Sequence, residues 1–391
     1  MLMMPGPTEV DPRVIRAMMR PAISHGDVRF HDVQDSASAQ VAQIIGTVGE
    51  VIILVSSGRG GIEAAMSSGF EPGDRIVVVN NGVFGNMLKN IARRCRIEVV
   101  EVTGEPGQPL DLDRISDAAA QTGICGIAMV HSETSTGVLN PIREVGEIAR
   151  RHSLVYIVDA VSSAGGAEIR MDEWGIDFLC TGSQKCIGSL AGLAMVGVSG
   201  RMWDFFAQRE RPIQSNYFDI SHWKRMWFPE ERGGELIFSY RRQPMTMATH
   251  LVYALDEACR MVLEEGLDNR IARHERAGRA IRASLPHLSL RQFPAESEAS
   301  PTTTAILPPE GIDEGRIRGF IKKNHGILAA GGLESYFRKM LRIGHMSLTA
   351  SPAYIMPTLA AIEHAMYSLG VDIKQGAAVE TAQAVFNEQR S

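Results

Sequence analysis

Lysine is scarce in this chain of 391 residues. Only seven occur, and arginine supplies most of the 40 positive charges. With 45 acidic residues the formal net charge is -5, so the sequence lacks the broad basic field that binds nucleic acid or an anionic membrane. We therefore expect neither as a partner. The lysines are Lys89, Lys185, Lys224, Lys322, Lys323, Lys339 and Lys374.

Cysteine is also rare, and no apolar run is long enough to span a bilayer. The cysteines form no C-x-x-C pair and no Cys/His cluster, so we expect reduced thiols and no metal site. The N-terminus lacks the basic segment and apolar run of a secretory signal. These absences favour a cytoplasmic protein. The five cysteines are Cys95, Cys125, Cys180, Cys186 and Cys259.

The composition, 45% hydrophobic and 22% charged, is sufficient for two domains of roughly 100 to 200 residues each. Apolar strand-like runs alternate with helical patterns between residues 51 and 198, which favours a mainly parallel, doubly wound sheet. Before them we expect a polar loop at 24–30 and a helix at 35–45. After a bridging helix at 250–266, the remaining strand and helix patterns predict a smaller α/β domain.

Two buried strands predicted at 154–158 and 176–180 each lead into polar residues. Asp159 follows the first strand, and Lys185 follows the turn after the second. If the strands are parallel neighbours, both side chains face the crevice where open α/β sheets bind ligands. A simple ion pair is the ordinary explanation for such residues. However, a lysine among apolar strands becomes a nucleophilic amine, and a carboxylate can keep a heteroaromatic nitrogen protonated. Those two roles are what a protein contributes to pyridoxal phosphate chemistry.

A glycine-rich turn, Ser-Ser-Gly-Arg-Gly-Gly at 56–61, joins a predicted strand to a helix. Backbone amides at such a helix start bind phosphate, and small residues permit its close approach. The turn is neither the dinucleotide fingerprint nor a Walker sequence, so by itself it is equally an ordinary connection. Because the dinucleotide fingerprint is missing, a dehydrogenase is disfavoured.

Arg342 lies in an apolar strand-like run, where an unpaired charge is costly. It therefore needs an anionic partner. Its planar guanidinium suits a substrate carboxylate bound through two hydrogen bonds, and a structural carboxylate is the alternative.

The sequence Val-Asp-Ala-Val-Ser-Ser at 158–163, followed by Thr-Gly-Ser-Gln-Lys-Cys at 181–186, resembles the class V aminotransferases of pyridoxal phosphate fold type I. The resemblance covers nearly the whole chain. It implies a large domain with a mainly parallel seven-stranded sheet at 21–250, a smaller C-terminal α/β domain at 251–391, and an N-terminal segment, 1–20, over the active site. It also implies a homodimer with shared active sites, which the segment 201–245 would help to build.

The same resemblance implies the cofactor pyridoxal 5'-phosphate and a role for individual residues around it. Lys185 would form the Schiff base with the cofactor, and Asp159 would pair with the pyridinium nitrogen. Phe84 would stack on one face of the ring, while Val161 would pack beneath it. Gln184 would lie near the ring hydroxyl.

Further positions follow from the loop His-Ser-Glu-Thr-Ser-Thr-Gly at 131–137 and from the turn at 56–61. Thr134 would hydrogen-bond near the ring hydroxyl. The cofactor phosphate would bind at Ser57, Gly58 and Arg59, and Thr246 would reach the phosphate of a neighbouring subunit.

Three residues are candidates for binding substrate. Arg342 matches the family position for the substrate carboxylate. Gly6 would contact substrate, for which an ordinary tight turn is the alternative. His25 would point into the site, although a loop histidine is more often solvated.

The implied reaction is a ping-pong transfer of an amino group from a small donor to glyoxylate or pyruvate. Segments at 216–219, 263–267 and 272–278 resemble ureidoglycine–glyoxylate aminotransferases, whereas 300–305 and 342–346 resemble pyridoxamine–pyruvate aminotransferases. His25 and Gln243 depart from the first branch, and Ser57 replaces an acidic residue of the second. The donor therefore stays open among alanine, serine, ureidoglycine and related small amines.

Two rival functions fit the residues less well. A cysteine desulfurase needs a reactive cysteine on the C-terminal side, and none follows Cys259. A non-catalytic binding protein on this fold would have no need to keep both Lys185 and Asp159.

Overall fold

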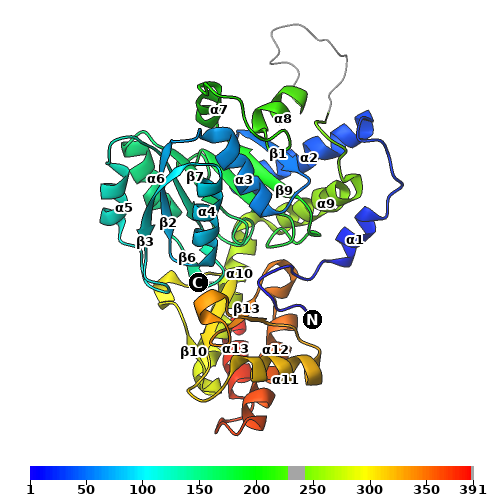
Figure 1. Cartoon of the computed structure of the whole chain (residues 1–391). Coiled ribbons are helices and arrows are strands. Elements are labelled where there is room, and N and C mark those ends of the chain that lie inside the picture. Colours follow the sequence, from blue (N-terminus) through cyan, green and yellow to red (C-terminus); the bar gives the residue numbers. More distant parts are fainter. Residues whose placement is uncertain (228–242, 389–391) are drawn as a thin grey trace.

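The computed structural model describes residues 1–227 and 243–388. It contains a larger body built on a seven-stranded sheet and a smaller body built on a four-stranded sheet (Figure 1). Residues 228–242, part of the segment expected to build a dimer, lie outside the described residues.

The larger sheet is mainly parallel, as predicted. In spatial order its strands are β1 (Glu50–Leu54), β9 (Ala194–Val198), β8 (Phe178–Gly182), β7 (Val155–Asp159), β4 (Ile124–Val130), β2 (Arg75–Asn80) and β3 (Glu98–Thr103). Only β9 runs against its neighbours, since it pairs antiparallel with both β1 and β8. β7 and β8 are parallel neighbours, with Asp159 opposite Cys180. This pairing confirms the premise on which the site was predicted.

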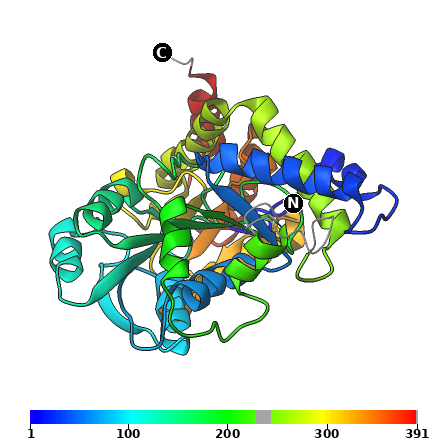
Figure 2. The ribbon, with the colours of Figure 1, turned by 90° about the horizontal axis from the view of Figure 1, so that it is seen from above.

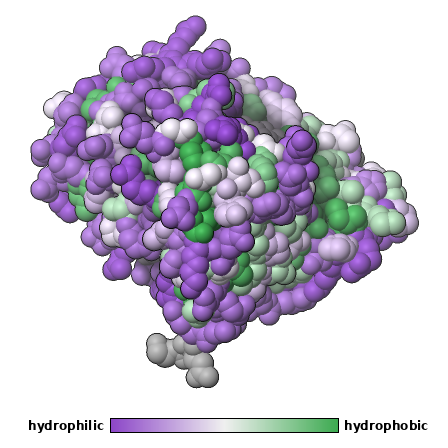
Figure 3. All heavy atoms as spheres, turned by 90° about the horizontal axis from the view of Figure 1, so that it is seen from below, coloured by the Kyte–Doolittle hydropathy of each residue, from purple (hydrophilic) through white to green (hydrophobic). Residues whose placement is uncertain are grey.

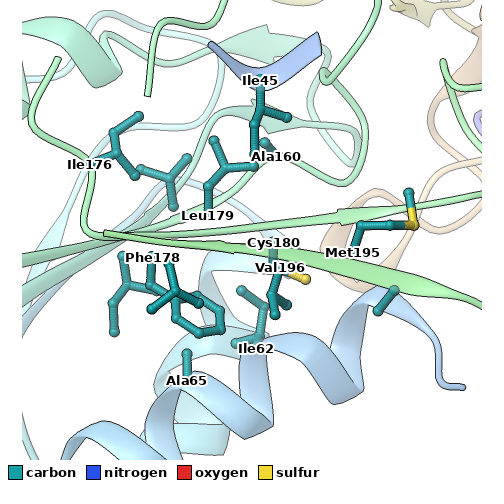
Figure 4. Close-up of a cluster of buried hydrophobic side chains, with 14 of the residues drawn as sticks. Ile45, Ile62, Ala65, Ala160, Ile176, Phe178, Leu179, Cys180, Met195 and Val196 are labelled. Atoms are coloured by element: carbon teal, nitrogen blue, oxygen red, sulfur yellow. The ribbon is translucent and has the colours of Figure 1, made fainter. Parts of the chain in front are cut away.

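Helices cover both faces of this sheet (Figure 2). Because successive side chains of a strand point to opposite faces, Phe178 of β8 packs toward Ile62 and Ala65 of one helix, while Leu179 points toward Ile45 of another (Figure 4). The continuous apolar strands are therefore explained by burial on both sides. The helices of this body are α1 (Pro12–Met18), α2 (Val28–Ile45), α3 (Gly58–Gly69), α4 (Val83–Arg94), α5 (Leu112–Ala119), α6 (Ile142–Arg151), α7 (Gly200–Ala207), α8 (Ile220–Trp227) and α9 (Thr249–Glu265).

Helix α2 begins earlier than the sequence predicted. The side chain of Asp27 accepts a hydrogen bond from the backbone N–H of Arg29 and caps the helix, so part of the expected loop at 24–30 is helical. The first turn carries Val28, which is 67% exposed. Phe30, which is 0% exposed, is the single buried apolar residue of that turn, and one position alone shows no helical period.

The smaller body has an antiparallel sheet covered by helices. Its strands are β10 (Arg291–Gln292), β11 (Thr303–Leu307), β13 (Leu341–Gly344) and β12 (Ala330–Gly331), and its helices are α10 (Leu267–Ser284), α11 (Glu314–His325), α12 (Pro352–Ser368) and α13 (Ala377–Asn387). The buried side chains of α9, up to Val262, join the core of the larger body, whereas those of α10 from Ala277 onward join the smaller core. The buried side chains thus change from the larger core to the smaller core between Val262 and Ala277.

Shorter elements complete the chain. β5 (Ser132–Glu133) and β6 (Val138–Leu139) form a two-stranded ribbon beside the larger sheet. Single 3-10 turns occur at Leu285–Leu288, Glu296–Glu298, Glu334–Tyr336 and Ser347–Thr349.

The first eight residues run between the two bodies (Figure 1). The backbone N–H of Met3 donates to the carbonyl of Leu328 at 2.8 Å, and the N–H of Gly344 donates to the carbonyl of Met3 at 2.9 Å. On the other side, the N–H of Thr8 donates to the carbonyl of Gln184 at 3.1 Å. The N-terminal segment therefore joins the smaller sheet to the turn that carries Lys185.

Seen from below, the surface is largely hydrophilic with scattered apolar patches (Figure 3). Among the described residues, no helix combines the length and the apolarity needed to cross a membrane. The same residues hold no cluster of three or more potential metal ligands, and all five cysteines are free.

Candidate active site

A cavity of about 250 Å³ opens at the carboxyl edge of the parallel strands. It is bounded by the ends of β4 and β7, the turn after β8, and the first turns of α3 and α4. Eight of the predicted site residues meet there, together with four that were not predicted. The lining residues are Ser57, Gly58, Arg59, Phe84, Met87, Val130, Ser132, Asp159, Val161, Ser162, Gln184 and Lys185.

The amine of Lys185 lies in a site that disfavours its charge. Burial, reinforced by the nearby cation of Arg342, lowers the pKa of Lys185 from 10.5 to about 8. Its ammonium donates a hydrogen bond to the carbonyl of Pro5 in the N-terminal segment. At pH 7 about a tenth of this amine is therefore unprotonated and nucleophilic, far more than of an ordinary lysine.

Asp159 is the last residue of β7 and is buried. Its Oδ1 accepts a hydrogen bond from the backbone N–H of Val161 at 2.9 Å. Burial raises the pKa of Asp159 to about 6, and the negative charge of Glu133 adds to this rise. A protonated ring nitrogen placed beside this carboxylate would supply the positive charge that it lacks.

The start of α3 forms the phosphate side of the cavity. Ser57 stands at the N-cap, but its hydroxyl makes no capping hydrogen bond and so is available to a ligand. At Gly58 a Cβ would lie only 2.3 Å from Cγ2 of Val161, so the helix can approach the ring position only without a side chain there. Arg59 is exposed and adds a cation to the positive end of the helix.

One buried polar atom of the residues that line the cavity has no partner among the described residues. The side-chain Oε1 of Gln184 is buried and has no hydrogen-bond partner. The cavity also combines a nucleophilic amine, a buried carboxylate, an aromatic wall at Phe84 and a helix start with an uncapped hydroxyl. These residues fit pyridoxal 5'-phosphate, which has an aldehyde, a ring nitrogen, two planar faces, a hydroxyl and a phosphate.

Thr134 lies in the short loop between β5 and β6. It is buried but is not among the residues that line the cavity; its backbone carbonyl accepts a hydrogen bond from Arg342 Nη1 at 2.8 Å. Ser132, two residues earlier, lines the cavity instead. The alternation of side chains along β5 was the available signal, but a strand of two residues is too short to recognise from sequence.

Glu133 is a residue of this site that sequence reasoning missed. It is 0% exposed. Its Oε2 accepts the backbone N–H groups of Phe84 and Gly85, both at 3.0 Å, and its Oε1 accepts the N–H and the hydroxyl of Ser135. This carboxylate thus ties the loop after β5 to the start of α4, where Phe84 lies. Burial raises its pKa.

Arg342 lies in β13 and is only 6% exposed. Its Nε donates to the carbonyl of Gly331 at 2.9 Å, and Nη1 donates to Thr134, so both known partners are neutral. No carboxylate within residues 1–227 and 243–388 forms an ion pair with it. Burial lowers its pKa to about 10. Among the described residues, the charges of Glu133 and Glu314 act on Arg342 without forming an ion pair with it, so its guanidinium can still bind an anion directly.

The three remaining predicted residues are distributed differently. Gly6 lies directly on the lysine: a Cβ there would be 2.5 Å from Cδ, Cε and Nζ of Lys185. His25 is half-buried and Thr246 is exposed, and neither lines the cavity. The position of Thr246 away from the cavity of its own chain is compatible with the expected contact to a second subunit.

Comparisons with known proteins agree with this chemistry. The sequence matches the family described as aminotransferase class-V over residues 1–350. The (S)-ureidoglycine–glyoxylate transaminase of Bacillus subtilis is 33% identical over 404 residues, which cover 98% of this chain and 95% of that protein. The pyridoxamine–pyruvate transaminase of Mesorhizobium japonicum is 29% identical over 384 residues, which cover 98% and 95% respectively. The crystal structure of a ureidoglycine–glyoxylate aminotransferase from Bacillus subtilis is similar with a TM-score of 0.92 and 34% identity, covering 99% of this chain and 98% of that one.

Proposed function

Because the chain belongs to the class-V aminotransferases, which are pyridoxal-phosphate-dependent enzymes, we propose that it transfers an amino group from a small donor to glyoxylate or pyruvate. The donors that we consider are alanine, serine and ureidoglycine. Two 2-oxo acids, glyoxylate and pyruvate, occur in the names of the relatives, and both are small monocarboxylates.

Arg342 is the residue that supports this proposal most directly. It is a buried cation whose identified partners are neutral carbonyl groups, and its charge reaches Lys185, whose pKa it lowers. A substrate carboxylate at Arg342 would supply the missing anion and place the neighbouring carbon near the amine of Lys185. Gly6 lies on the same amine and leaves little room above it, which favours substrates with small side chains.

When bound, pyridoxal phosphate supplies an electron sink that stabilises negative charge at the substrate α-carbon. Lys185 would hold the cofactor and, once its amine is released, move a proton at that α-carbon. Asp159 would keep the ring nitrogen protonated, because a buried carboxylate is stabilised by a positive charge next to it.

The other residues would orient the reacting groups. Ser57, the first amides of α3 and Arg59 would hold the phosphate. Phe84 would cover one face of the ring and exclude water from it. Arg342 would orient the carboxylate of the amino donor in one half of the cycle and of the 2-oxo acid in the other.

We further propose that the enzyme works as a homodimer. Thr246 and its sequence neighbours are not among the residues that line the cavity. This supports a role toward the cofactor phosphate of a second copy rather than of its own chain.

Absorbance spectroscopy tests the proposed function. The purified protein with added pyridoxal phosphate should develop a band at 410–430 nm, about the range expected of a lysine–cofactor Schiff base. Alanine, serine and (S)-ureidoglycine are then titrated separately, and glyoxylate or pyruvate is added afterwards. Bleaching by one donor and recovery on adding an acceptor would identify both substrates.

Lys185→Ala is the control for this experiment. It should give no such band. A wild-type protein that forms no band, or a band that persists unchanged in Lys185→Ala, would contradict the proposal.

A further inference from the structure

A buried arginine outside the cavity makes contacts that the proposed chemistry does not yet explain. Arg270, in the first turns of α10, is 5% exposed. Its guanidinium donates to the carbonyl of Gly165 at 3.0 Å, to the carbonyl of Cys186 at 2.7 Å and to the hydroxyl of Ser347 at 3.0 Å. On its remaining side it pairs with the carboxylate of Glu265 at 2.7 Å.

Two of these contacts reach segments that carry the central residues of the site. Cys186 directly follows Lys185 along the chain, and Gly165 lies in the turn that follows Asp159. The carbonyls of both segments are thus held by one rigid, planar group. Without the Arg270 guanidinium, the two segments could move independently of each other.

The third contact reaches the segment that carries the anion-binding residue. Ser347 follows β13, the strand that contains Arg342. The segment packs so closely against the lysine turn that a Cβ at Gly188 would lie 2.1 Å from the hydroxyl oxygen of Ser347. Three chain segments, from both bodies of the molecule, therefore meet at a single guanidinium.

The two turns that Arg270 contacts also pack closely against each other. At Gly166 a Cβ would come within 2.6 Å of the sulfur of Cys186, so the backbone of one turn lies against a side chain of the other. A guanidinium can donate in three directions within its plane, whereas a lysine ammonium donates from one point. Lysine at position 270 could therefore satisfy only part of this set.

We propose that Arg270 is a positioning residue that fixes Lys185, Asp159 and Arg342 relative to one another. It touches neither substrate nor cofactor and acts through the backbone of the three segments. This inference rests on the proposed function, because that function defines what the three residues must do together.

The chain supplies a matched control on the same helix. Arg273 pairs with the same Glu265 at 2.6 Å and donates to the backbone carbonyls of Ser347 and Ala350 at 2.7 and 2.9 Å. Within the described part of the chain it makes no hydrogen bond to the turns after β7 and β8. Arg270→Lys and Arg273→Lys therefore remove comparable contacts to α9 and to the Ser347 segment, but only the first releases Cys186 and Gly165.

The first measurement is hydrogen–deuterium exchange on the protein without cofactor. The amides of Gly166 and Ala167 donate to Ser163, and the amides of Gly188 and Ser189 are likewise hydrogen-bonded. In Arg270→Lys we expect these four amides to exchange at least about 10-fold faster than in the wild type, because local opening becomes easier. In Arg273→Lys they should exchange at the wild-type rate.

The second measurement is steady-state kinetics with the donor and acceptor that the absorbance titration identifies. A misplacement of about 1 Å costs on the order of 100-fold in rate, so kcat of Arg270→Lys should fall by about 10- to 100-fold. The KM for the 2-oxo acid should change less than about 3-fold, because Arg273 still holds the Ser347 segment. The pH midpoint of the 410–430 nm band should also move in Arg270→Lys and stay constant in Arg273→Lys.

Equal exchange and equal kcat in the two lysine variants would overturn the inference. If Arg270→Lys does not fold, Arg270→Met, which fills the volume without any donor, is subjected to the same two measurements and criteria. A wild-type protein without a Lys185-dependent band would contradict the proposed function, while the exchange comparison would still decide whether Arg270 holds the two turns.

Discussion

At the scale of single residues, the buried carboxylate of Glu133 holds two chain segments together through hydrogen bonds. It accepts four hydrogen bonds, two of them from the backbone of Phe84 and Gly85. Donors of this kind stabilise a carboxylate even where burial raises its pKa. The aromatic wall of the cavity is therefore placed by a residue that does not itself line the cavity.

Replacing Glu133 by glutamine tests this role, and the same replacement at an exposed glutamate serves as the control. The amide presents hydrogen-bond donors where a second acceptor is needed, so we expect Glu133→Gln to lower the free energy of unfolding by about 1–3 kcal/mol. It should also weaken cofactor binding, because Phe84 loses its anchor. Glu147→Gln, at a position 58% exposed, should leave both quantities unchanged. Urea denaturation and cofactor titration are the measurements; wild-type values for Glu133→Gln would refute the assignment.

Gly6 makes a second prediction at this scale. Its φ of +111° and the 2.5 Å approach to Lys185 both exclude a side chain. We expect Gly6→Ala to slow formation of the cofactor band and to reduce kcat by about 10-fold or more, since the lysine amine must move aside. Gly26→Ala is the control, because a Cβ there meets only the Ser24 hydroxyl at 3.7 Å. Stopped-flow absorbance measures the rate at which the cofactor band forms. Equal rates in Gly6→Ala and Gly26→Ala would contradict the prediction.

Residues at the ends of predicted strands could be found from sequence, whereas residues that act through long-range contacts could not. Asp159 and Lys185 each follow a continuous apolar run, and their meeting follows from parallel pairing alone. Glu133 and Arg270 carry no comparable signal, because their importance depends on which backbone groups fold against them. Thr134 was assigned by resemblance, and its hydrogen bond near the ring hydroxyl stays a prediction; its carbonyl accepts a hydrogen bond from Arg342.

At the scale of elements, the larger sheet was predictable because strands that are buried on both faces have unbroken apolar sequences. The reversed direction of β9 was not, because an antiparallel strand buried on both faces has the same apolar composition as a parallel one. The order β10-β11-β13-β12 also had no local signal, since the pairing of β11 with β13 joins Thr304 to Ile343.

Helix α13 owes its start to a residue on another helix. Gly376, the N-cap, has no side chain, and Glu363 of α12 accepts the backbone N–H groups of Gly376 and Ala378 at 3.1 and 2.9 Å instead. We expect Glu363→Ala to reduce stability by about 1–2 kcal/mol, as loss of an N-cap does, with kcat unchanged. Glu380→Ala, an exposed position in the first turn of the same helix, is the control. A melting temperature of Glu363→Ala equal to that of Glu380→Ala would contradict this account.

At the scale of the whole molecule, three buried neutral histidines set the response to acid. Burial lowers the pKa of His131 and of His345 to about 3, and it lowers that of His274 well below the usual 6.5. The unfolded chain therefore binds more protons than the folded chain below about pH 6.5. Stability should fall as the pH drops below that value, by up to about 1.4 kcal/mol per pH unit for each histidine.

Asp159 opposes this trend in the protein without cofactor. Its folded pKa of about 6 lies above the unfolded value, so its contribution to stability is present at low pH and is lost as the pH rises through 6. Urea denaturation at pH 7, 6 and 5 measures the balance. We expect the wild type to lose stability toward pH 5. His345→Asn should lose less over the same range, because the variant lacks one histidine that takes up a proton on unfolding. Constant stability across this range would contradict the assignment.

The N-terminal segment has a consequence for the order in which the active site is completed during synthesis. Met3 is synthesised long before Leu328 and Gly344, with which it pairs. Synthesis proceeds at about 5–20 residues per second, so the segment waits on the order of tens of seconds for its partners. Until then the Asp159 and Lys185 strands can pair, but the carbonyl of Pro5 has no fixed place above the lysine. The segment around Met3 thus reaches its final place only after Gly344 has been synthesised, and until then the lysine that it covers in the folded protein stays open.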